Sequence, residues 1–359
     1  MEASSNQRIF GLDVMRAIAI LLVVFGHGGL VSGNLFESFP VIPLLDGVEL
    51  FFVLSGLLIG TILIKQLNVE DGFTLRELFV FWKRRWFRTL PNYYLILLVQ
   101  VLLVTYGIIG GDSEAINWKF LFFLQNFNEG FVDFFWESWS LAIEEWFYIL
   151  FPVITWLTIR FIGIKKGLLI AIGLMLLFPL LHRYSISDEN VDFFWWDVNF
   201  RKVVVTRLDA IMFGVLAAYI KFYYSEFWKK CGTISFISGI ALISLILFFP
   251  QDPNSLFAKT LYFTIVSLGA MLLLPKLDAL KTVSISWLSR SITYISKISY
   301  AMYLVNLGLV AQVIATNWEL NSKKEHLLAY CVYWTATICI SAFIYHVYEL
   351  PMTKLRDRR

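Results

Sequence analysis

Charged residues are scarce in this sequence. Only 16% of the 359 residues are Asp, Glu, Lys or Arg, whereas 58% are hydrophobic, and the mean hydropathy is +0.69. A water-soluble protein of this length could not bury so much apolar surface, so a soluble globular protein is excluded. The net charge of +3 is small, and the basic residues form no stripe with interleaved aromatic residues, which argues against nucleic acid as a partner. The composition predicts a protein of the lipid bilayer.

Cysteines are few as well. Cys231, Cys331 and Cys339 lack the spacing of metal ligands and lie in or beside apolar segments, so we interpret them as packing residues and expect no metal. No internal repeat, heptad or low-complexity segment divides the chain, and we expect one membrane domain over residues 1–359. Its first apolar segment contains Arg16 and no small-residue cleavage site, which predicts a retained helix and not a signal peptide.

Apolar runs recur from one end of the chain to the other. A helix needs about 20 residues to cross about 30 Å of hydrocarbon, and ten runs approach this length. The sequence therefore predicts an all-α, polytopic membrane bundle of about ten transmembrane helices. The predicted spans are 10–31, 43–66, 92–109, 138–159, 167–183, 203–222, 232–250, 258–275, 294–316 and 326–348.

The distribution of Lys and Arg predicts the orientation, because basic connections are retained in the cytoplasm. Of the 30 basic residues, 22 lie on the amino-terminal side of the spans, seven lie on the opposite side, and Arg207 lies within a span. Both termini are therefore expected in the cytoplasm. The two longest connections of the opposite side, 110–137 and 184–202, are rich in acids, Trp and Phe. They fit an interfacial aromatic belt, the favoured interpretation, or a platform on which sugar rings stack.

Ionisable residues inside spans cost about 2.5–3.5 kcal/mol each on insertion scales and mark candidate functional sites. Asp13, Arg16 and His27 share one face of the first span, because eleven steps of 100° return His27 to within about 20° of Arg16. Eleven residues also separate Arg16 and His27 by about 16 Å along the helix axis. A structural, hydrogen-bonded histidine between Gly26 and Gly28 is the alternative interpretation.

Three other spans bring ionisable residues to the layer of His27. They are Asp46 and Glu49 in the second span, Glu144 in the fourth, and Arg207 and Asp209 in the sixth. The coincidence of depth favours a common site. A water-facing position for Asp46 and Glu49 remains open, and a structural ion pair involving Arg207 and Asp209 is as well supported as a functional role.

A basic segment precedes the third span and contains Arg84, Arg85 and Arg88. Arg85 and Arg88 are three residues apart, so on a helix their guanidiniums share a face, where planar forks bind phosphate oxygens bidentately. Topology alone accounts for positive charge here, but it does not require this spacing. We therefore favour a phosphate site.

Six blocks, in order along nearly the whole chain, resemble the motifs of the membrane acyltransferase family 3, which O-acylates O-antigens, nodulation factors, peptidoglycan and some macrolides. The blocks are Arg16 to His27, Phe51 to Gly56, Arg85 to Pro91, Trp139 to Glu144, Arg207 to Asp209 and Ser299 to Leu304. The resemblance implies an O-acyltransferase of the bacterial cytoplasmic membrane. It also implies acetyl-CoA as the acyl donor and a carbohydrate or glycolipid as the acceptor.

The sequence departs from the family pattern at two points. Asn306 stands where the last block often has a histidine. Many members also carry a carboxy-terminal, extracytoplasmic, hydrolase-like domain, whereas this sequence stops about ten residues after its last predicted span. We expect that an extracytoplasmic partner protein supplies such a domain if transfer requires it.

The expected mechanism begins with coenzyme A at the cytoplasmic mouth. The expected binding residues are Arg85 and Arg88, helped by Arg84 and Arg16, together with Asp13 and Tyr300. An extended pantetheine arm is of the same order as the offset between Arg16 and His27, so the thioester is expected to arrive near the imidazole. His27 then deprotonates the acceptor hydroxyl or accepts the acyl group itself, and both routes remain open.

Three further residues are expected around this histidine. Glu144 orients the imidazole or stabilises its protonated form, Arg207 neutralises the developing oxyanion, and Asp46 belongs to the same catalytic set. The strongest alternative function is a transporter or flippase, since intramembrane charges also mark transport pathways, although the two similar halves of a typical carrier are not evident here. A structural or sensory subunit would leave the intramembrane histidine and arginine without purpose.

Overall fold

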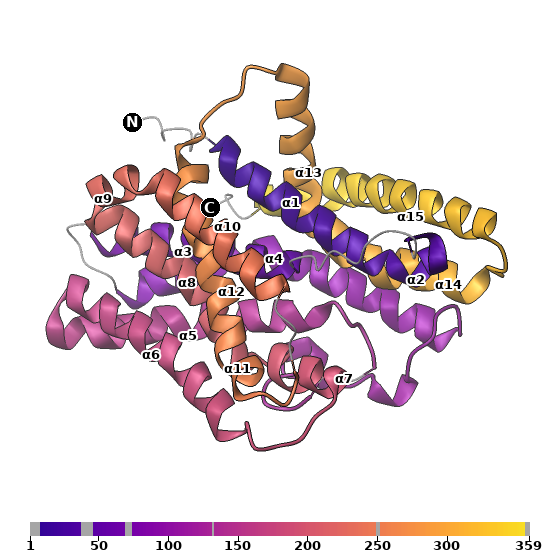
Figure 1. Cartoon of the computed structure of the whole chain (residues 1–359), viewed down its shortest axis with the longest axis horizontal. Coiled ribbons are helices and arrows are strands. Elements are labelled where there is room, and N and C mark those ends of the chain that lie inside the picture. Colours follow the sequence, from indigo (N-terminus) through magenta and orange to yellow (C-terminus); the bar gives the residue numbers. More distant parts are fainter. Residues whose placement is uncertain (1–7, 37–45, 69–73, 131–132, 249–251, 356–359) are drawn as a thin grey trace.

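The computed structural model describes residues 8–36, 46–68, 74–130, 133–248 and 252–355 (Figure 1), and every regular element in these ranges is helical. The α-helices are α1 (Phe10–His27), α2 (Gly29–Ser32), α3 (Gly47–Leu67), α4 (Leu75–Thr105), α5 (Ser138–Ile162), α6 (Ile164–Ser185), α7 (Phe193–Trp196), α8 (Val204–Tyr223), α9 (Ser225–Lys230), α10 (Gly232–Phe248), α11 (Leu256–Lys259), α12 (Leu261–Ala279), α13 (Ser286–Val305), α14 (Val313–Asn317), α15 (Lys323–Ile344) and α16 (Leu350–Leu355). The 3-10 turns are η1 (Gly33–Phe36), η2 (Ser113–Ala115) and η3 (Trp118–Phe122), and the π-helical turns are η4 (Asp197–Arg201), η5 (Asn306–Gln312) and η6 (Tyr345–Glu349).

Each of the ten predicted spans coincides with a helical segment, so the prediction of a polytopic all-α bundle is confirmed. In the part of the chain that the structure describes, eight segments are long and apolar enough to cross a membrane: Phe10–Phe36, Gly47–Leu67, Leu75–Thr105, Ser138–Ile162, Ile164–Ser185, Leu261–Ala279, Ser286–Asn317 and Lys323–Leu355. A ninth is broken, because Phe193–Arg201 meets Val204–Tyr223 at 65°. The tenth, α10, is a shorter apolar helix of 17 residues. Residues 43–45 and 249–250 of two predicted spans lie outside the described residues.

The third span was predicted to begin too late in the sequence. The predicted start at residue 92 follows Pro91, but α4 begins at Leu75 and contains Pro91. Thr74 caps the helix in a capping box, in which its backbone N–H donates to Glu77 Oε2 at 2.9 Å. The basic segment therefore lies inside the helix, because proline is tolerated in membrane helices where neighbouring groups satisfy the freed backbone.

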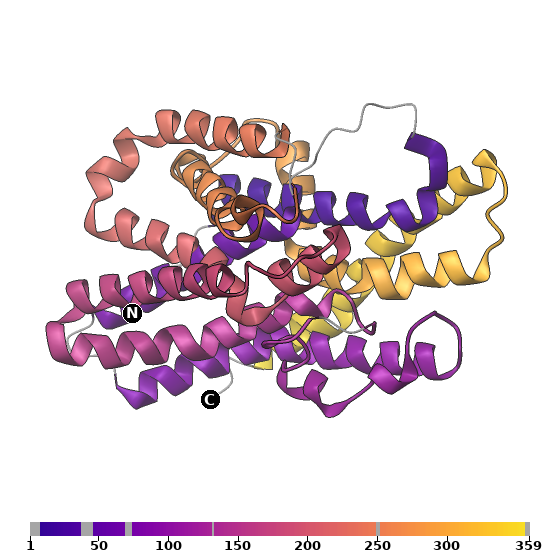
Figure 2. The same cartoon turned by 60° about the horizontal axis from the view of Figure 1, so that its bottom comes forward.

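The helix α3 packs against α8, α1, α12 and α5. On one side of it, α1 packs on α13, which in turn contacts α15, and these helices lie together in Figure 1. On the other side, α8 packs against α6, and α6 against α5. The helix α10 joins the bundle through α12 and α9 (Figure 2). The two groups of helices meet along α3, so any pocket between the groups is lined by α3.

Small residues allow α3 and α8 to approach closely. A Cβ atom added to Gly56 would overlap the carbonyl oxygen of Ile211, and one added to Gly214 would overlap the carbonyl oxygen of Val53. Close backbone approach through small residues is a common way in which membrane helices gain packing energy, because lipid provides no hydrophobic driving force between them. The pair Gly56 and Gly214 therefore fixes the spacing of the two central helices.

We predict that Gly56→Leu separates α3 from α8 and lowers the thermal stability of the protein purified in detergent. Gly173→Leu on α6 is the control, because a Cβ at Gly173 meets no atom within 4 Å. The melting temperature should fall in the first variant by several degrees more than in the second, since overpacking costs about 1–3 kcal/mol. Equal melting temperatures would show that the α3–α8 contact is not tight.

Candidate functional site

Two contacts define the ends of the bundle near α1. Ser296 of α13 donates a 2.7 Å hydrogen bond to Asp13 at the start of α1, and Asn306, directly after α13, bonds His27 at the end of α1. The two helices are therefore parallel. We name the two ends of the bundle the Phe10 side and the His27 side.

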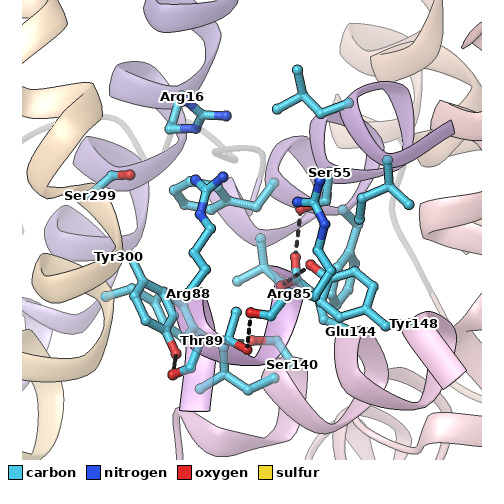
Figure 3. Close-up of a pocket in the computed structure, with 17 residues that line it drawn as sticks. Arg16, Ser55, Arg85, Arg88, Thr89, Ser140, Glu144, Tyr148, Ser299 and Tyr300 are labelled. Carbon is cyan, nitrogen blue, oxygen red and sulfur yellow. Dashed lines mark hydrogen bonds between the residues drawn. The ribbon is translucent and has the colours of Figure 1, made fainter. Parts of the chain in front are cut away.

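A pocket lies between α1, α3, α4, α5 and α13 (Figure 3). It encloses about 800 Å³ of space, its open mouth included. Its lining residues are Arg16, Val48, Phe51, Phe52, Ser55, Leu58, Ile59, Arg85, Arg88, Thr89, Ser140, Leu141, Glu144, Tyr148, Ser299, Tyr300 and Tyr303. On α3 the lining extends from Val48 to Ile59, which are eleven helical steps apart, so the pocket follows the bundle axis for about 16 Å.

Three guanidiniums enter the pocket toward the Phe10 side. Arg85 and Arg88 come from one face of α4, as their spacing predicts, and Arg16 comes from α1 (Figure 3). Arg16 is held by a carboxylate, because its Nη1 lies 3.8 Å from Asp13 Oδ1. Asp13 in turn accepts from Arg8 Nη2 at 2.6 Å and from Ser296 Oγ at 2.7 Å. Asp13 thus contacts Arg16 and does not itself line the pocket.

The carboxylate of Glu144 faces these arginines. It accepts a hydrogen bond from Ser55 Oγ at 2.8 Å and another from Tyr148 Oη at 3.0 Å (Figure 3). The arrangement joins α3 to α5 across the middle of the pocket. The hydrogen bonds of Glu144 among the described residues go to Ser55 and Tyr148, and none links it to His27, so its role in orienting the imidazole stays a prediction.

Tyr300 also lies where the cofactor site was expected. It lines the pocket, and its Oη donates to the carbonyl oxygen of Thr89 at 2.8 Å. The side chain of Thr89 donates to Glu145 Oε1 at 2.6 Å. Glu145, next to Glu144 in sequence, is therefore buried on the far side of Thr89 and fixes the wall that carries Arg85 and Arg88.

At its His27 end the pocket is lined by Tyr303 and its neighbours. Tyr303 Oη lies 2.6 Å from Ser140 Oγ and donates to the carbonyl oxygen of Glu137 at 2.9 Å. Its ring meets Phe51 edge to face, with centroids 6.4 Å apart. Tyr303 precedes Asn306 by three residues, so this end of the pocket lies about 4.5 Å along the axis before the histidine layer.

His27 is half-buried and is not among the residues that line the pocket. Its Nδ1 lies 2.6 Å from Oδ1 of Asn306. The amide nitrogen of Asn306 donates to the carbonyl oxygens of Met302 and Tyr303, both at 2.8 Å, which turns Oδ1 toward the ring. Because Oδ1 can only accept, a neutral imidazole carries its proton on Nδ1 and keeps the lone pair of Nε2 available.

Two of the other predicted residues lie away from the pocket. Asp46 caps α3 by accepting from the backbone N–H of Val48 at 2.9 Å, and it forms an ion pair with Arg201. Arg84 is exposed on α4 and does not line the pocket. Arg84 misses the pocket because successive residues of a helix are turned by about 100°, so its side chain leaves α4 on a different face from that of Arg85.

Arg207 is fully buried and lies outside the pocket, contrary to its expected place beside the histidine. Its Nη2 contacts Glu49 at 2.7 Å, and its guanidinium lies 4.5 Å over the Phe263 ring. Asp209, its neighbour in the sequence, pairs with Arg183 at 2.8 Å. These residues do lie at a similar depth in the bundle, but α8 turns their side chains toward α3, α6 and α12. Similar depth therefore did not bring them to one site.

Sequence reasoning missed several residues of the site. Ser55 and Tyr148, which bond to Glu144, lie within or beside motif blocks. They carry no charge, so the cost of burying a charge in a membrane did not single them out as candidates. Ser140 and Tyr303 line the pocket and contact each other, and Asn306 was treated only as a departure from the family. Among the described residues, no group of three or more His, Cys, Asp and Glu side chains is placed to hold a metal ion.

Comparison with known proteins identifies relatives along almost the entire chain. Residues 9–346 match a family model described as an acyltransferase domain. A putative O-acetyltransferase of Staphylococcus aureus strain COL is 27% identical over 385 residues, and the O-acetyltransferase OatA of S. aureus strain NCTC 8325 is 27% identical over 378 residues. Both alignments cover 96% of this chain but 57% of the relative, so the chain spans little more than half the length of these relatives. No solved structure matches.

We predict that Arg207→Met destabilises the fold, because it leaves the buried carboxyl group of Glu49 without its ion-pair partner. Breaking a buried ion pair costs about 3–5 kcal/mol of the free energy of unfolding, whereas removing both charges restores most of it. Thermal unfolding of the purified protein should therefore show a large loss for Arg207→Met and a recovery for the double variant Arg207→Met, Glu49→Leu. A single variant with normal stability and no activity would instead assign Arg207 to catalysis.

Proposed function

The chain belongs to the membrane acyltransferase family 3, and from this premise we propose that it transfers an acetyl group from acetyl-CoA to a hydroxyl of a cell-surface or exported glycan. The observation that carries the proposal is the pocket. It extends from a cluster of guanidiniums to within about one helical turn of the layer of His27. The protein is a multi-pass membrane enzyme. We further propose that it lies in a bacterial cytoplasmic membrane with the Phe10 side facing the cytoplasm, as the excess of basic residues on that side favours.

The Phe10 side has the chemistry to bind the phosphates of coenzyme A. Arg16, Arg85 and Arg88 bring three positive charges into one pocket against the single carboxylate of Glu144. Guanidiniums bind phosphate oxygens through paired, charge-assisted hydrogen bonds. The pocket length of about 16 Å is of the same order as an extended pantetheine arm, so a donor anchored at the arginines places its thioester near Phe51, Ser140 and Tyr303.

His27 is the proposed general base. With Nδ1–H donated to Asn306, Nε2 can accept the proton of an acceptor hydroxyl. The hydroxyl oxygen then forms a bond to the acyl carbon, the carbon–sulfur bond breaks, and the proton held on Nε2 leaves with the thiolate of coenzyme A. Asn306 fixes the tautomer and the ring plane. As a neutral amide it does not stabilise an imidazolium as a carboxylate would, which suits a base that must release its proton again.

Acceptors are proposed to reach the histidine from the side opposite the arginines. Large aromatic side chains are exposed there on the connections after α4 and α6, among them Trp118, Phe122, Phe193 and Trp195. Aromatic faces of this kind can stack on sugar rings or lie in the membrane interface. The printed names of the relatives, O-acetyltransferases, agree with a hydroxyl acceptor.

We predict that His27→Ala lowers acetyl transfer by about 10²–10⁴-fold, the usual contribution of a general base, while membrane insertion is retained. Asn306→Leu should also lower the rate, because Nδ1–H loses its acceptor, and Asn306→Asp should retain more activity than Asn306→Leu. Release of coenzyme A by the purified protein in nanodiscs, with mass spectrometry of the glycan, measures the transfer. Near wild-type acetylation by His27→Ala would remove the histidine from the mechanism.

A second prediction concerns the donor site. Replacing both Arg85 and Arg88 by alanine should raise the Kd for coenzyme A at least tenfold, because hydrogen bonds to charged groups contribute about 1.5–3 kcal/mol each. The variant should also show a weaker dependence of Kd on salt than the wild type. Lys83→Ala, an exposed charge on the same helix, is the matched control and should leave the Kd unchanged. Equal affinities of the double variant and the wild type would reject the phosphate site.

A further inference from the structure

The two ends of the pocket differ in shape as well as in charge. Toward the Phe10 side it contains the guanidiniums and opens to solvent, where Arg88 is exposed. Toward the His27 side the rings of Phe51 and Tyr303 meet, with centroids 6.4 Å apart, and Val48 lines the pocket one turn further along α3. A donor anchored by phosphates at the open end extends its acyl group toward this pair.

Tyr303 is held rigidly in this position. Its hydroxyl is engaged by Ser140 Oγ at 2.6 Å and by the carbonyl oxygen of Glu137 at 2.9 Å, and its side chain is 6% exposed. Phe51 meets it at an interplanar angle of 72°, the edge-to-face arrangement that aromatic pairs prefer. Two hydrogen bonds and a ring contact thus oppose the movement that a longer acyl chain would require.

We propose that the Phe51 and Tyr303 pair sets the length of the acyl group that the enzyme transfers, admitting acetyl and rejecting longer chains. This inference rests on the proposed function. Each extra methylene in a tight apolar site changes kcat/KM by about 10- to 200-fold, so an end bounded by two rigid rings discriminates strongly between acetyl and butyryl donors. The pair lies about 4.5 Å before the histidine layer, so an acyl group that reaches the pair is about one helical turn from the layer of the proposed base.

The helix α3 provides a matched control for the test. Leu58 lies seven residues after Phe51, on the same face of α3, and also lines the pocket. It is about 10 Å further toward the arginines. Truncation of either side chain to alanine enlarges the same pocket, but only the change at Phe51 enlarges it where the acyl group is proposed to lie.

The experiment compares acetyl-, butyryl- and hexanoyl-CoA as donors for the purified enzyme in nanodiscs. We expect Phe51→Ala to raise the ratio of kcat/KM for butyryl-CoA to that for acetyl-CoA at least tenfold, and Leu58→Ala to leave this ratio unchanged. Phe51 is half-buried and faces the pocket, so its truncation opens space to the pocket and creates no closed cavity. If Phe51→Ala does not fold, Phe51→Leu should show a smaller rise in the same ratio.

Two outcomes overturn the inference while leaving the proposed function intact. An unchanged ratio in a folded, acetyl-transferring Phe51 variant would show that the pair does not limit the chain. A rise in Leu58→Ala alone would show that the acyl group lies at the other end. The proposed function itself fails at an earlier step, if the wild-type protein consumes no acetyl-CoA, and this result is visible before any variant is made.

Discussion

A charged side chain inside an apolar bundle is tolerated only when a partner satisfies it, and this constraint orders the structure. Two arginines meet it by complete burial, since Arg207 pairs with Glu49 and Arg183 pairs with Asp209 at 2.8 Å or less. These pairs join α3 and α6 to α8 and leave no charge for chemistry. Arg16, Arg85 and Arg88 instead line the pocket, where a bound anion could contact all three.

The same constraint gives a function to small polar residues around the pocket. Glu144 would be costly in this environment without Ser55 and Tyr148, and the imidazole of His27 would have no defined tautomer without Asn306. Asn306 is itself fixed, because both of its amide hydrogens are used by backbone carbonyls at the end of α13. The proposed chemistry at the histidine therefore depends on the backbone geometry of the π-helical turn η5 that begins at Asn306.

The helix α3 takes part in both of these features, the buried ion pairs and the pocket. It runs opposite to α1, contributes Glu49 to a buried ion pair, and lines the pocket on another face from Val48 to Ile59. Close contact through Gly56 and Gly214 holds it against α8. A helix fixed on one side by packing and ion pairing offers a rigid wall on the other, which holds Phe51 and the other pocket-lining side chains of α3 in place.

The sequence by itself determined the membrane class, the helical segments and the common face of Arg85 and Arg88, because hydropathy and helical spacing depend only on the order of residues along the chain. It also indicated that Arg16 and His27 lie on one helix about 16 Å apart. Only the tertiary structure decided that Asn306 holds His27, that Glu144 faces the arginines, and that Arg207 is sequestered by Glu49. The physical reason is that sequence gives the depth of a residue in a membrane, whereas rotation and packing of each helix decide which neighbour it meets.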